Sequence, residues 1–233
     1  MLAGYGAGEG GAREAARGGA AVVVVDTYRA STTIAVLVAY GARVVPVASI
    51  EEAEMYPADF RIGERGSAKV KGFDFGNSPT EVGEARIKPG TTVVLSSTNG
   101  TRIVEAARGA PAILAGAFVN AHAVAEDLAA GEPGSRVVVV GCGWRGSRSS
   151  EDESAAGAIL YRLRELGAGL DERAERVVEG YLGRPEKALR DNTAARRLKR
   201  LGYERDLDFC LAPNTVPVVP RLVGGAFVDG RGA

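Results

Sequence analysis

"AVVVVDTYRASTTIAVLVAYGARVVPVA", residues 21–48, contains two apolar runs separated by a polar turn and a longer segment with helical character. The runs at 21–25 and 44–48 are short and rich in β-branched residues, as buried strands are. The stretch between them, at 33–40, has the composition of a helix that ends at the pair Gly41-Ala42. The order strand, helix, strand is typical of an α/β protein.

The same alternation recurs along the rest of the chain. Further strands are expected at 92–95, 112–115 and 136–140, with a late one around 215–219. Helices are expected at 102–108, 121–129 and 154–166. We therefore predict one α/β domain over residues 1–233, a three-layer α/β/α arrangement with a mixed, mostly parallel sheet.

A weak internal repeat supports this architecture. Three segments run from a polar turn through a helix to a Gly-Ala pair, which begins at Gly41, Gly109 and Gly167. Glycine suits the residue after a helix because it adopts the left-handed conformation without steric cost. The repeat suggests an internal duplication, which we keep as a hypothesis.

Polar loops follow three of the expected strands: "DTYRASTT" from Asp26, "SSTNGT" from Ser96 and "GCGWRGSRSSED" from Gly141. In open α/β sheets, ligands bind beyond the carboxyl ends of the strands, where helix N-termini offer free N–H groups to anions. Helix capping would explain the hydroxyl side chains of these loops. It does not explain the charged residues among them.

Composition restricts the classes of function. The 233 residues are 45% hydrophobic, and 29 Lys and Arg balance 29 Asp and Glu, so the broad basic surface of a nucleic-acid-binding protein is not expected. Two cysteines indicate a reducing compartment. No apolar run approaches membrane-spanning length, and Glu9 and Glu14 interrupt any secretory signal, so we expect a cytoplasmic protein without a membrane partner. A homodimer is left open.

A single histidine, His122, disfavours His-rich metal sites and Ser-His-Asp hydrolases. The segment 60–81, "FRIGERGSAKVKGFDFGNSPTE", is long, polar and glycine-rich, and Phe73 and Phe75 argue against its being free in solvent. We expect it to form a lid or a wall of a binding site.

Two short motifs overlap in the third loop. "GCGWRG", residues 141–146, has the spacing of a dinucleotide-binding turn, but its helix begins late and no suitably placed acidic residue follows. Cys142 and Arg148 have the C-x5-R spacing of cysteine-dependent phosphatases. Glu151 and Asp152 would oppose a thiolate there unless a cation lay between them. The cysteine-phosphatase hypothesis stays open as an alternative.

Five ordered blocks resemble the 2-phosphosulfolactate phosphatase family. They are "VVVVDTYRASTTIA", "GERGSAKVKGFDFGNSPTE", "LSSTNGTRIV", "GAFVNAHAVA" and "GCGWRGSRSSEDESAAGAI", with a fainter echo in "AARRLKRLGYERDLDFCL". The resemblance implies a Mg²⁺-dependent phosphatase with an α/β fold of its own, which converts 2-phospho-3-sulfolactate to sulfolactate on the way to coenzyme M. The sequence departs from the pattern in its Gly/Ala-rich N-terminus, where the family has a short strand, and after Val219.

With this resemblance, Asp26 and Glu151 or Asp152, in loops that follow expected strands, become candidate Mg²⁺ ligands. Glu64, in the long polar segment, is a further candidate. Arg29 and Arg65 are candidates for bidentate contacts to phosphate and sulfonate, although Arg65 could equally pair with a nearby acid. The expected catalytic residues are Asp26, Arg29, Glu64 and Asp152. Further substrate contacts are expected from Ser31, Thr32, Thr33, Asn77, Ser78, Thr98, Asn99, Gly100 and Thr101. A protein that binds a nucleotide or another anion without turnover remains the other alternative.

Overall fold

A computed structural model describes residues 1–131 and 135–232. Over these residues the chain forms one sheet of 11 strands in the order β5-β4-β6-β3-β11-β10-β7-β2-β8-β1-β9. The strands are β1 Leu2–Ala7, β2 Ala21–Val25, β3 Arg43–Val47, β4 Phe60–Arg65, β5 Ala68–Lys69, β6 Thr92–Ser96, β7 Ile113–Gly116, β8 Arg136–Gly141, β9 Gly169–Leu170, β10 Pro220–Val223 and β11 Ala226–Asp229.

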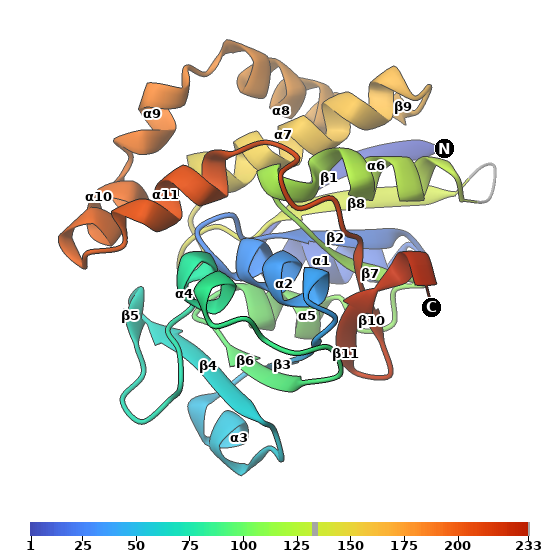
Figure 1. The fold of residues 1–233 in the computed structure, drawn as a ribbon. Coiled ribbons are helices and arrows are strands. Elements are labelled where there is room, and N and C mark those ends of the chain that lie inside the picture. The colour runs from blue at the N-terminus through green and yellow to red at the C-terminus, as the bar shows by residue number, and fades with distance from the viewer. Residues whose placement is uncertain (132–134, 233) are drawn as a thin grey trace.

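Helices connect most of these strands (Figure 1). They are α1 Gly8–Arg17, α2 Ala30–Ala39, α3 Ile50–Met55, α4 Pro79–Glu84, α5 Gly100–Ala106, α6 Ala121–Ala129, α7 Ser150–Glu165, α8 Glu172–Gly183, α9 Glu186–Arg190, α10 Thr193–Arg200 and α11 Glu204–Leu211, with short 3-10 turns at Phe118–Asn120 and Gly230–Gly232.

The sheet has two parallel parts joined by an antiparallel hairpin. Strands β4, β6 and β3 form one parallel part, and β7, β2, β8, β1 and β9 form the other. The hairpin β10–β11 lies between them and pairs with β3 through Phe227 and Val44, and with β7 through Arg221 and Leu114. This arrangement confirms the predicted mixed, mostly parallel sheet (Figure 1).

Helices cover both faces of the sheet, as the alternation along β2 shows. Val22 and Val24 belong to an apolar cluster with residues of α1, α2 and α5, whereas Val23 and Val25 belong to a second cluster with residues of α6, α7 and α8. Successive side chains of a strand point to opposite faces, so a strand with two buried faces is uniformly apolar. The sheet is therefore the middle of three layers.

Element boundaries follow local chemistry closely. The helix expected at 121–129 and the strand expected at 21–25 match α6 and β2 at both ends. Gly41, Gly109 and Gly167 all have positive φ, between 76° and 92°, just after their helices. The three Gly-Ala pairs thus end helices as predicted, whereas the suggested duplication remains a hypothesis.

Both ends of the chain differ from expectation. The Gly/Ala-rich N-terminus forms β1, which pairs in parallel with β8 from Leu2 to Ala7, so the short strand that the sequence seemed to lack is present. The strand could not be predicted from the sequence because its glycine and alanine residues do not give the alternation of large apolar and polar side chains by which a strand is identified. The late strand expected at 215–219 is instead the hairpin β10–β11, which starts at Pro220.

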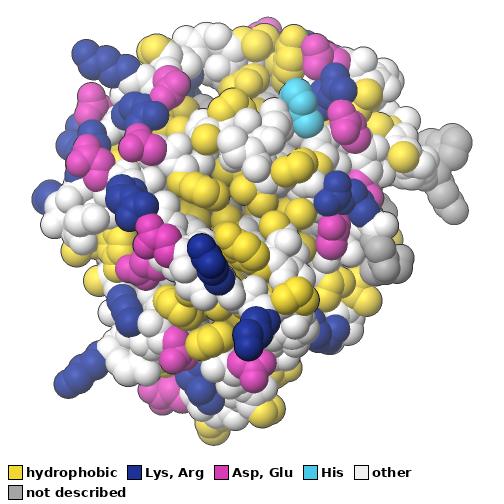
Figure 2. Space-filling view, viewed as in Figure 1, with side chains coloured by type: hydrophobic (Ala, Val, Ile, Leu, Met, Phe, Trp, Pro, Cys, Tyr) yellow, Lys and Arg dark blue, Asp and Glu magenta, His cyan; other side chains and the backbone are white. Residues whose placement is uncertain are grey.

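Charged side chains of both signs are mixed on the face seen in Figure 2. Lysine and arginine side chains alternate there with acidic ones, as the zero net charge implies. Within residues 1–131 and 135–232, none of the helices combines the length and the apolar character that crossing a bilayer requires.

Candidate active site

The polar loops converge at the carboxyl edge of the sheet on one small pocket. It encloses about 10 Å³, roughly the space that one water molecule needs. Its lining comes from the ends of β2 and β4, from the loops after β6 and β8, and from the segment before α4: Asp26, Tyr28, Arg29, Glu64, Ser67, Asn77, Asn99 and Trp144. Five of these residues, Asp26, Arg29, Glu64, Asn77 and Asn99, were predicted site residues.

Asp26 follows β2 directly and lies where two helices begin. Its Oδ2 accepts a hydrogen bond from the Gly100 N–H at 3.0 Å, at the start of α5, and its Oδ1 accepts one from the Ala30 N–H at 3.4 Å, at the start of α2. Burial, followed by repulsion from the Glu64 carboxylate, raises the pKa of Asp26 to about 7. The hydrogen bond from Gly100 thus joins the turn after β6, in one parallel part of the sheet, to Asp26 after β2, in the other part.

Glu64 lies near the end of β4 and is 6% exposed. Its Oε1 accepts from the Thr98 N–H at 2.6 Å, and its Oε2 accepts from the Ser67 N–H at 2.7 Å. Backbone N–H groups that could have bound a substrate anion, those of Thr98 and Gly100, therefore point at the protein's own carboxylates. Each carboxylate oxygen has a second lone pair left for a cation or a water molecule.

Asp152 and Glu151, in the first turn of α7, lie beside this pocket rather than in its lining. Asp152 accepts from the Thr27 N–H at 2.8 Å and the Gly143 N–H at 2.9 Å, and from the Ser149 hydroxyl at 2.7 Å. Burial, then repulsion from Glu151 and Asp26, raises its pKa well above the ordinary value. Its geometry is that of a residue which ties the loop after β2 to the loop after β8.

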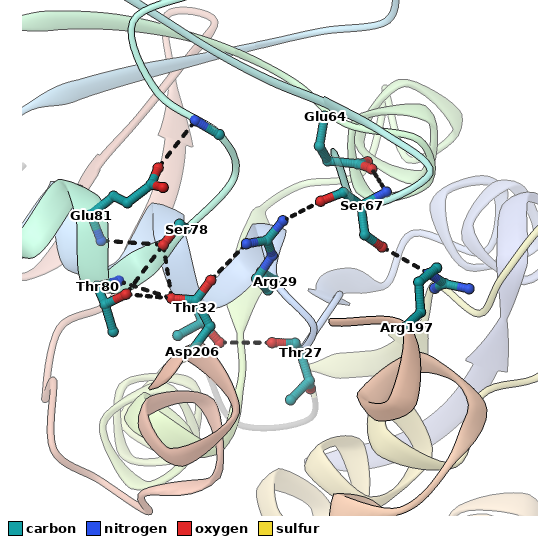
Figure 3. A network of polar contacts seen from close by, with 11 residues as sticks. Thr27, Arg29, Thr32, Glu64, Ser67, Ser78, Thr80, Glu81, Arg197 and Asp206 are labelled. Atoms are coloured by element: carbon teal, nitrogen blue, oxygen red, sulfur yellow. Dashed lines mark hydrogen bonds and ion pairs between the residues drawn. The ribbon is translucent and has the colours of Figure 1, made fainter. Parts of the chain in front are cut away.

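Arg29 is held by the protein rather than left open to solvent. Its Nη1 donates to Asp206 Oδ2 at 2.6 Å and its Nη2 to the Ser67 carbonyl at 2.8 Å, while its guanidinium carbon lies 4.0 Å from the centroid of the Tyr203 ring. Figure 3 shows Arg29 between Asp206 and Ser67. Arg29, and not Arg65, therefore forms the ion pair with an acidic residue that the sequence suggested as an alternative for Arg65. Arg29 also lines the pocket.

Asp206 organises the wall of the site from α11. Besides Arg29, it accepts from the Ser78 hydroxyl at 2.8 Å and the Thr80 hydroxyl at 2.6 Å (Figure 3). Ser78 also accepts from the Glu81 N–H and so caps α4. The segment 60–81 is therefore a wall of the site, fixed by a helix more than a hundred residues later.

Arg197 of α10 was not predicted. Its guanidinium carbon lies 3.7 Å from the centroid of the Trp144 ring, and its Nε donates to the Ser67 hydroxyl at 2.9 Å. Burial lowers the pKa of its guanidinium, and the nearby charges of Glu151 and Glu64 oppose this effect only in part. Arg197 and Trp144 also line a groove of about 330 Å³ between residues 144–151 and the start of α10, which we call the Trp144 groove. The small pocket and the groove share Trp144.

Arg65 and most of the predicted hydroxyl groups bind within the protein. Arg65 donates to the Glu64 carbonyl at 2.7 Å and to the Ser96 hydroxyl at 3.0 Å, outside the pocket lining. Ser31, Thr32 and Thr101 each donate to the backbone carbonyl of a nearby residue. These bonds are not helix caps, because the N-cap residues of α2, α5 and α7 make no side-chain cap hydrogen bond, so the capping interpretation is wrong for these hydroxyl groups.

Several polar atoms at this edge lack a partner among the described residues: Thr27 Oγ1, Thr33 Oγ1, Asn77 Oδ1 and Thr98 Oγ1. Asn77 is 2% exposed and lines the pocket with Asp26 and Glu64. A buried amide oxygen without a hydrogen bond is costly, so its partner is supplied by a water molecule or by a bound ligand. Asn99 also lines the pocket and accepts from the Arg145 N–H at 3.2 Å.

The donor chemistry around the pocket fits a hard divalent cation. Two carboxylates that repel each other and one unpartnered amide oxygen are oxygen ligands, and Mg²⁺ commonly binds to one or two carboxylates together with water and substrate phosphate. Within the two described stretches, no three His, Cys, Asp or Glu side chains gather closely enough to hold a metal by themselves. Asp26 and Glu64 are thus the predicted ligands that share the pocket.

Cys142 does not have the environment of a nucleophile. It is 5% exposed, and burial together with the charges of Asp26 and Asp152 raises the pKa of its thiol well above the ordinary value. Arg148 forms an ion pair with Glu153 instead of approaching a thiolate. The structure gives the cysteine-phosphatase alternative no support.

Sequence reasoning missed Asp206, Arg197 and Asn192, which donates from its Nδ2 to Glu151 Oε2 at 2.7 Å. All three come from the region between α9 and α11. The faint block "AARRLKRLGYERDLDFCL" contained two of them, but nothing in its spacing separated these residues from surface charges.

Comparison with known proteins places this chain in a family. The family model described as 2-phosphosulpholactate phosphatase matches residues 11–225. A protein of Thermotoga petrophila, described as a probable 2-phosphosulfolactate phosphatase, is 39% identical over 88% of this chain and 90% of its own length. Proteins with the same description from Synechococcus sp. strain CC9605 and Carboxydothermus hydrogenoformans are 41% and 39% identical, over 87% and 91% of this chain and 89% and 88% of their own lengths. The chain belongs to the 2-phosphosulfolactate phosphatase family.

Proposed function

We propose that this protein hydrolyses the phosphate ester of 2-phospho-3-sulfolactate, or of a closely similar small polyanion, to the free hydroxy acid and phosphate. Membership of the family supports the reaction class. The observation that carries the proposal is the pocket in which Asp26 and Glu64 lie beside the unpartnered Asn77 oxygen, next to a groove that contains Arg197.

We further propose Mg²⁺ as the cofactor, held by Asp26 and Glu64 with Asn77 as a third oxygen ligand. When bound, such an ion offsets negative charge on phosphoryl oxygens and lowers the pKa of a coordinated water. Asp152 and Glu151 do not line the pocket. Asp152 supports it by accepting hydrogen bonds from the Thr27 and Gly143 N–H groups, which fixes the backbone next to the pocket.

The chain's own residues position the ester. The groove is large enough for a small metabolite, whereas the inner pocket admits little more than one water molecule. The substrate therefore lies in the groove with its phosphoryl end toward Asp26 and Glu64. Arg197 supplies paired N–H donors for a phosphate or sulfonate group, and its stacking on Trp144 fixes the plane of the guanidinium.

Phosphate release from 2-phospho-3-sulfolactate tests the proposal. We expect turnover with Mg²⁺, loss of turnover in excess EDTA, and slower turnover of 2-phospholactate, which lacks the sulfonate. Asp26→Asn should abolish activity, whereas Glu84→Gln, a surface carboxylate that pairs with Arg205, should leave it unchanged.

Full turnover in EDTA would refute the metal role while leaving the phosphatase assignment intact. Binding of the ester without phosphate release, seen as a rise in Tm, would instead favour the non-catalytic anion-binding alternative.

A further inference from the structure

A cavity between α7 and α8 lies outside the site described above. It has a volume of about 450 Å³, and its wall is formed by the end of β1, the start of α7 and one side of α8. Glu151 and Glu153 lie two positions apart on α7 and so about 200° apart around the helix axis. Accordingly, Glu151 lines the Trp144 groove and Glu153 lines this second cavity.

The charge of the lining is strongly unbalanced. Arg148, Arg173, Arg176 and Arg184 face the cavity, against one carboxylate, that of Glu153. Arg148 pairs with Glu153, and Arg176 with Glu172 on its own helix. Arg184 donates through Nη1 to the Ser150 carbonyl at 2.9 Å and the Ser154 hydroxyl at 2.6 Å, so its positive charge has no acidic partner in the described part of the chain.

The floor of the cavity contains a buried phenol. Tyr5 of β1 is 8% exposed and lines the cavity. Burial and the charges of Glu153 and Asp152 raise the pKa of this phenol, which keeps it protonated and able to donate. Among the hydrogen bonds formed by residues 1–131 and 135–232, none involves the Tyr5 hydroxyl. The hydroxyl is not among the fully buried polar atoms that lack a partner, so it can donate to water or to a ligand in the cavity.

We propose that this α7–α8 cavity is a second binding site, for a small organic polyanion with two or more phosphate, sulfonate or carboxylate groups. Three guanidinium groups, on Arg173, Arg176 and Arg184, surround one volume from different positions, so several acidic groups of one molecule can be bound at once. Metabolite-sized ligands fit cavities of this volume. The cavity borders the Trp144 groove, with which it shares Arg148, but none of its lining residues lines the small pocket that contains Asp26 and Glu64.

Isothermal titration calorimetry with tripolyphosphate tests the proposal on the 233-residue chain, after divalent metal has been removed with a chelating resin so that no EDTA, itself a polyanion, competes for the cavity. We expect saturable binding that Arg173→Ala/Arg176→Ala weakens about tenfold or more, since the double variant loses two guanidinium groups that form charge-assisted hydrogen bonds to the ligand. Both side chains are exposed, so the double variant should fold. Tyr5→Phe, which removes one hydroxyl, should weaken binding less.

Two controls keep the result specific. Arg162→Ala/Arg164→Ala removes the same charge from the far end of α7 and should leave binding unchanged. Arg197→Ala, in the Trp144 groove, should also leave it unchanged. Equal loss in the Arg162/Arg164 control, loss in Arg197→Ala alone, or no saturable binding by the wild-type protein would overturn the proposal.

Discussion

Arg29 and Asp206 lie 177 positions apart in the chain and form a buried ion pair, with 2.6 Å between Nη1 and Oδ2. Their side chains are 1% and 0% exposed. The pair joins the loop after β2 to α11, and through Ser78 and Thr80 it also holds the wall formed by residues 60–81. One carboxylate thus fixes three segments around the pocket.

Asp206→Ala should therefore destabilise the protein strongly. The change leaves the Arg29 charge buried without its partner, and removal of one member of a buried ion pair costs about 3 to 5 kcal/mol. We expect a clear fall in the free energy of unfolding, measured by urea denaturation. Asp208→Ala, which breaks an exposed pair with Arg190, should cost less than about 1 kcal/mol. Similar losses for both variants would contradict the structural role of Asp206.

The stability of the metal-free protein should decrease as the pH rises from about 4 to 7. Asp26 has a pKa of about 7 in the folded state against 3.8 for the unperturbed group, so the folded state retains a proton that the unfolded state has lost. The contribution is complete below pH 3.8 and is lost as the pH rises through 7, with a slope of up to about 1.4 kcal/mol per pH unit.

Asp26→Asn should flatten this slope, because the amide does not titrate. Thermal unfolding in EDTA at several pH values measures the effect, with Glu84→Gln as the matched surface control. Asp152 and Glu151, whose pKa values are also raised, contribute in the same direction and leave part of the slope in place. An unchanged slope in Asp26→Asn would show that this carboxyl titrates normally.

Arg197→Ala should raise KM for the phosphate ester about tenfold to a hundredfold, since a charged hydrogen bond to substrate contributes about 1.5 to 3 kcal/mol. Arg197→Lys should recover only part of the loss, because an ammonium group cannot bind two oxygens in one plane. Arg196→Ala, one position earlier, removes the same charge outside the Trp144 groove. Steady-state kinetics that show equal KM values for Arg196→Ala and Arg197→Ala would argue against a substrate contact.

Fluorescence of Trp144 should report directly on the site. Trp144 is the only tryptophan in the chain, and the Arg197 guanidinium covers its ring at 3.7 Å. We expect the emission to change when 2-phospho-3-sulfolactate is added to the Asp26→Asn variant, and the change to be lost when Arg197→Ala is added to that variant. A titration with no spectral change would place the substrate away from Trp144.

Cys142→Ser should retain activity within about twofold of the wild type. The thiol is buried and its pKa is raised, so it is not the nucleophile that a cysteine phosphatase needs. The phosphate-release assay measures the outcome. Loss of turnover in a folded Cys142→Ser protein would restore the cysteine mechanism.

The strand at 21–25, the helix at 121–129 and the three glycine helix ends could be predicted because each depends on residues within a few positions. Apolar runs, β-branched side chains and glycine act locally, and the alternation of strand and helix then favours a parallel sheet. The sequence also predicted that the loop from Asp26 lies at the carboxyl edge, because loops after parallel strands meet there. Glu64 and Asn77 could be predicted only as members of a long polar segment, and the structure places Glu64 on strand β4.

Only the tertiary structure could show which partner each of these side chains has. Arg29 binds Asp206 instead of facing solvent, Asp152 binds backbone N–H groups, and Arg197 reaches Trp144 from a helix that no motif marks. These pairings join segments far apart in the chain, so they depend on how α10 and α11 pack and not on any local pattern. Local sequence determines where a polar residue lies along its strand or helix, whereas the packing of distant elements determines what it binds.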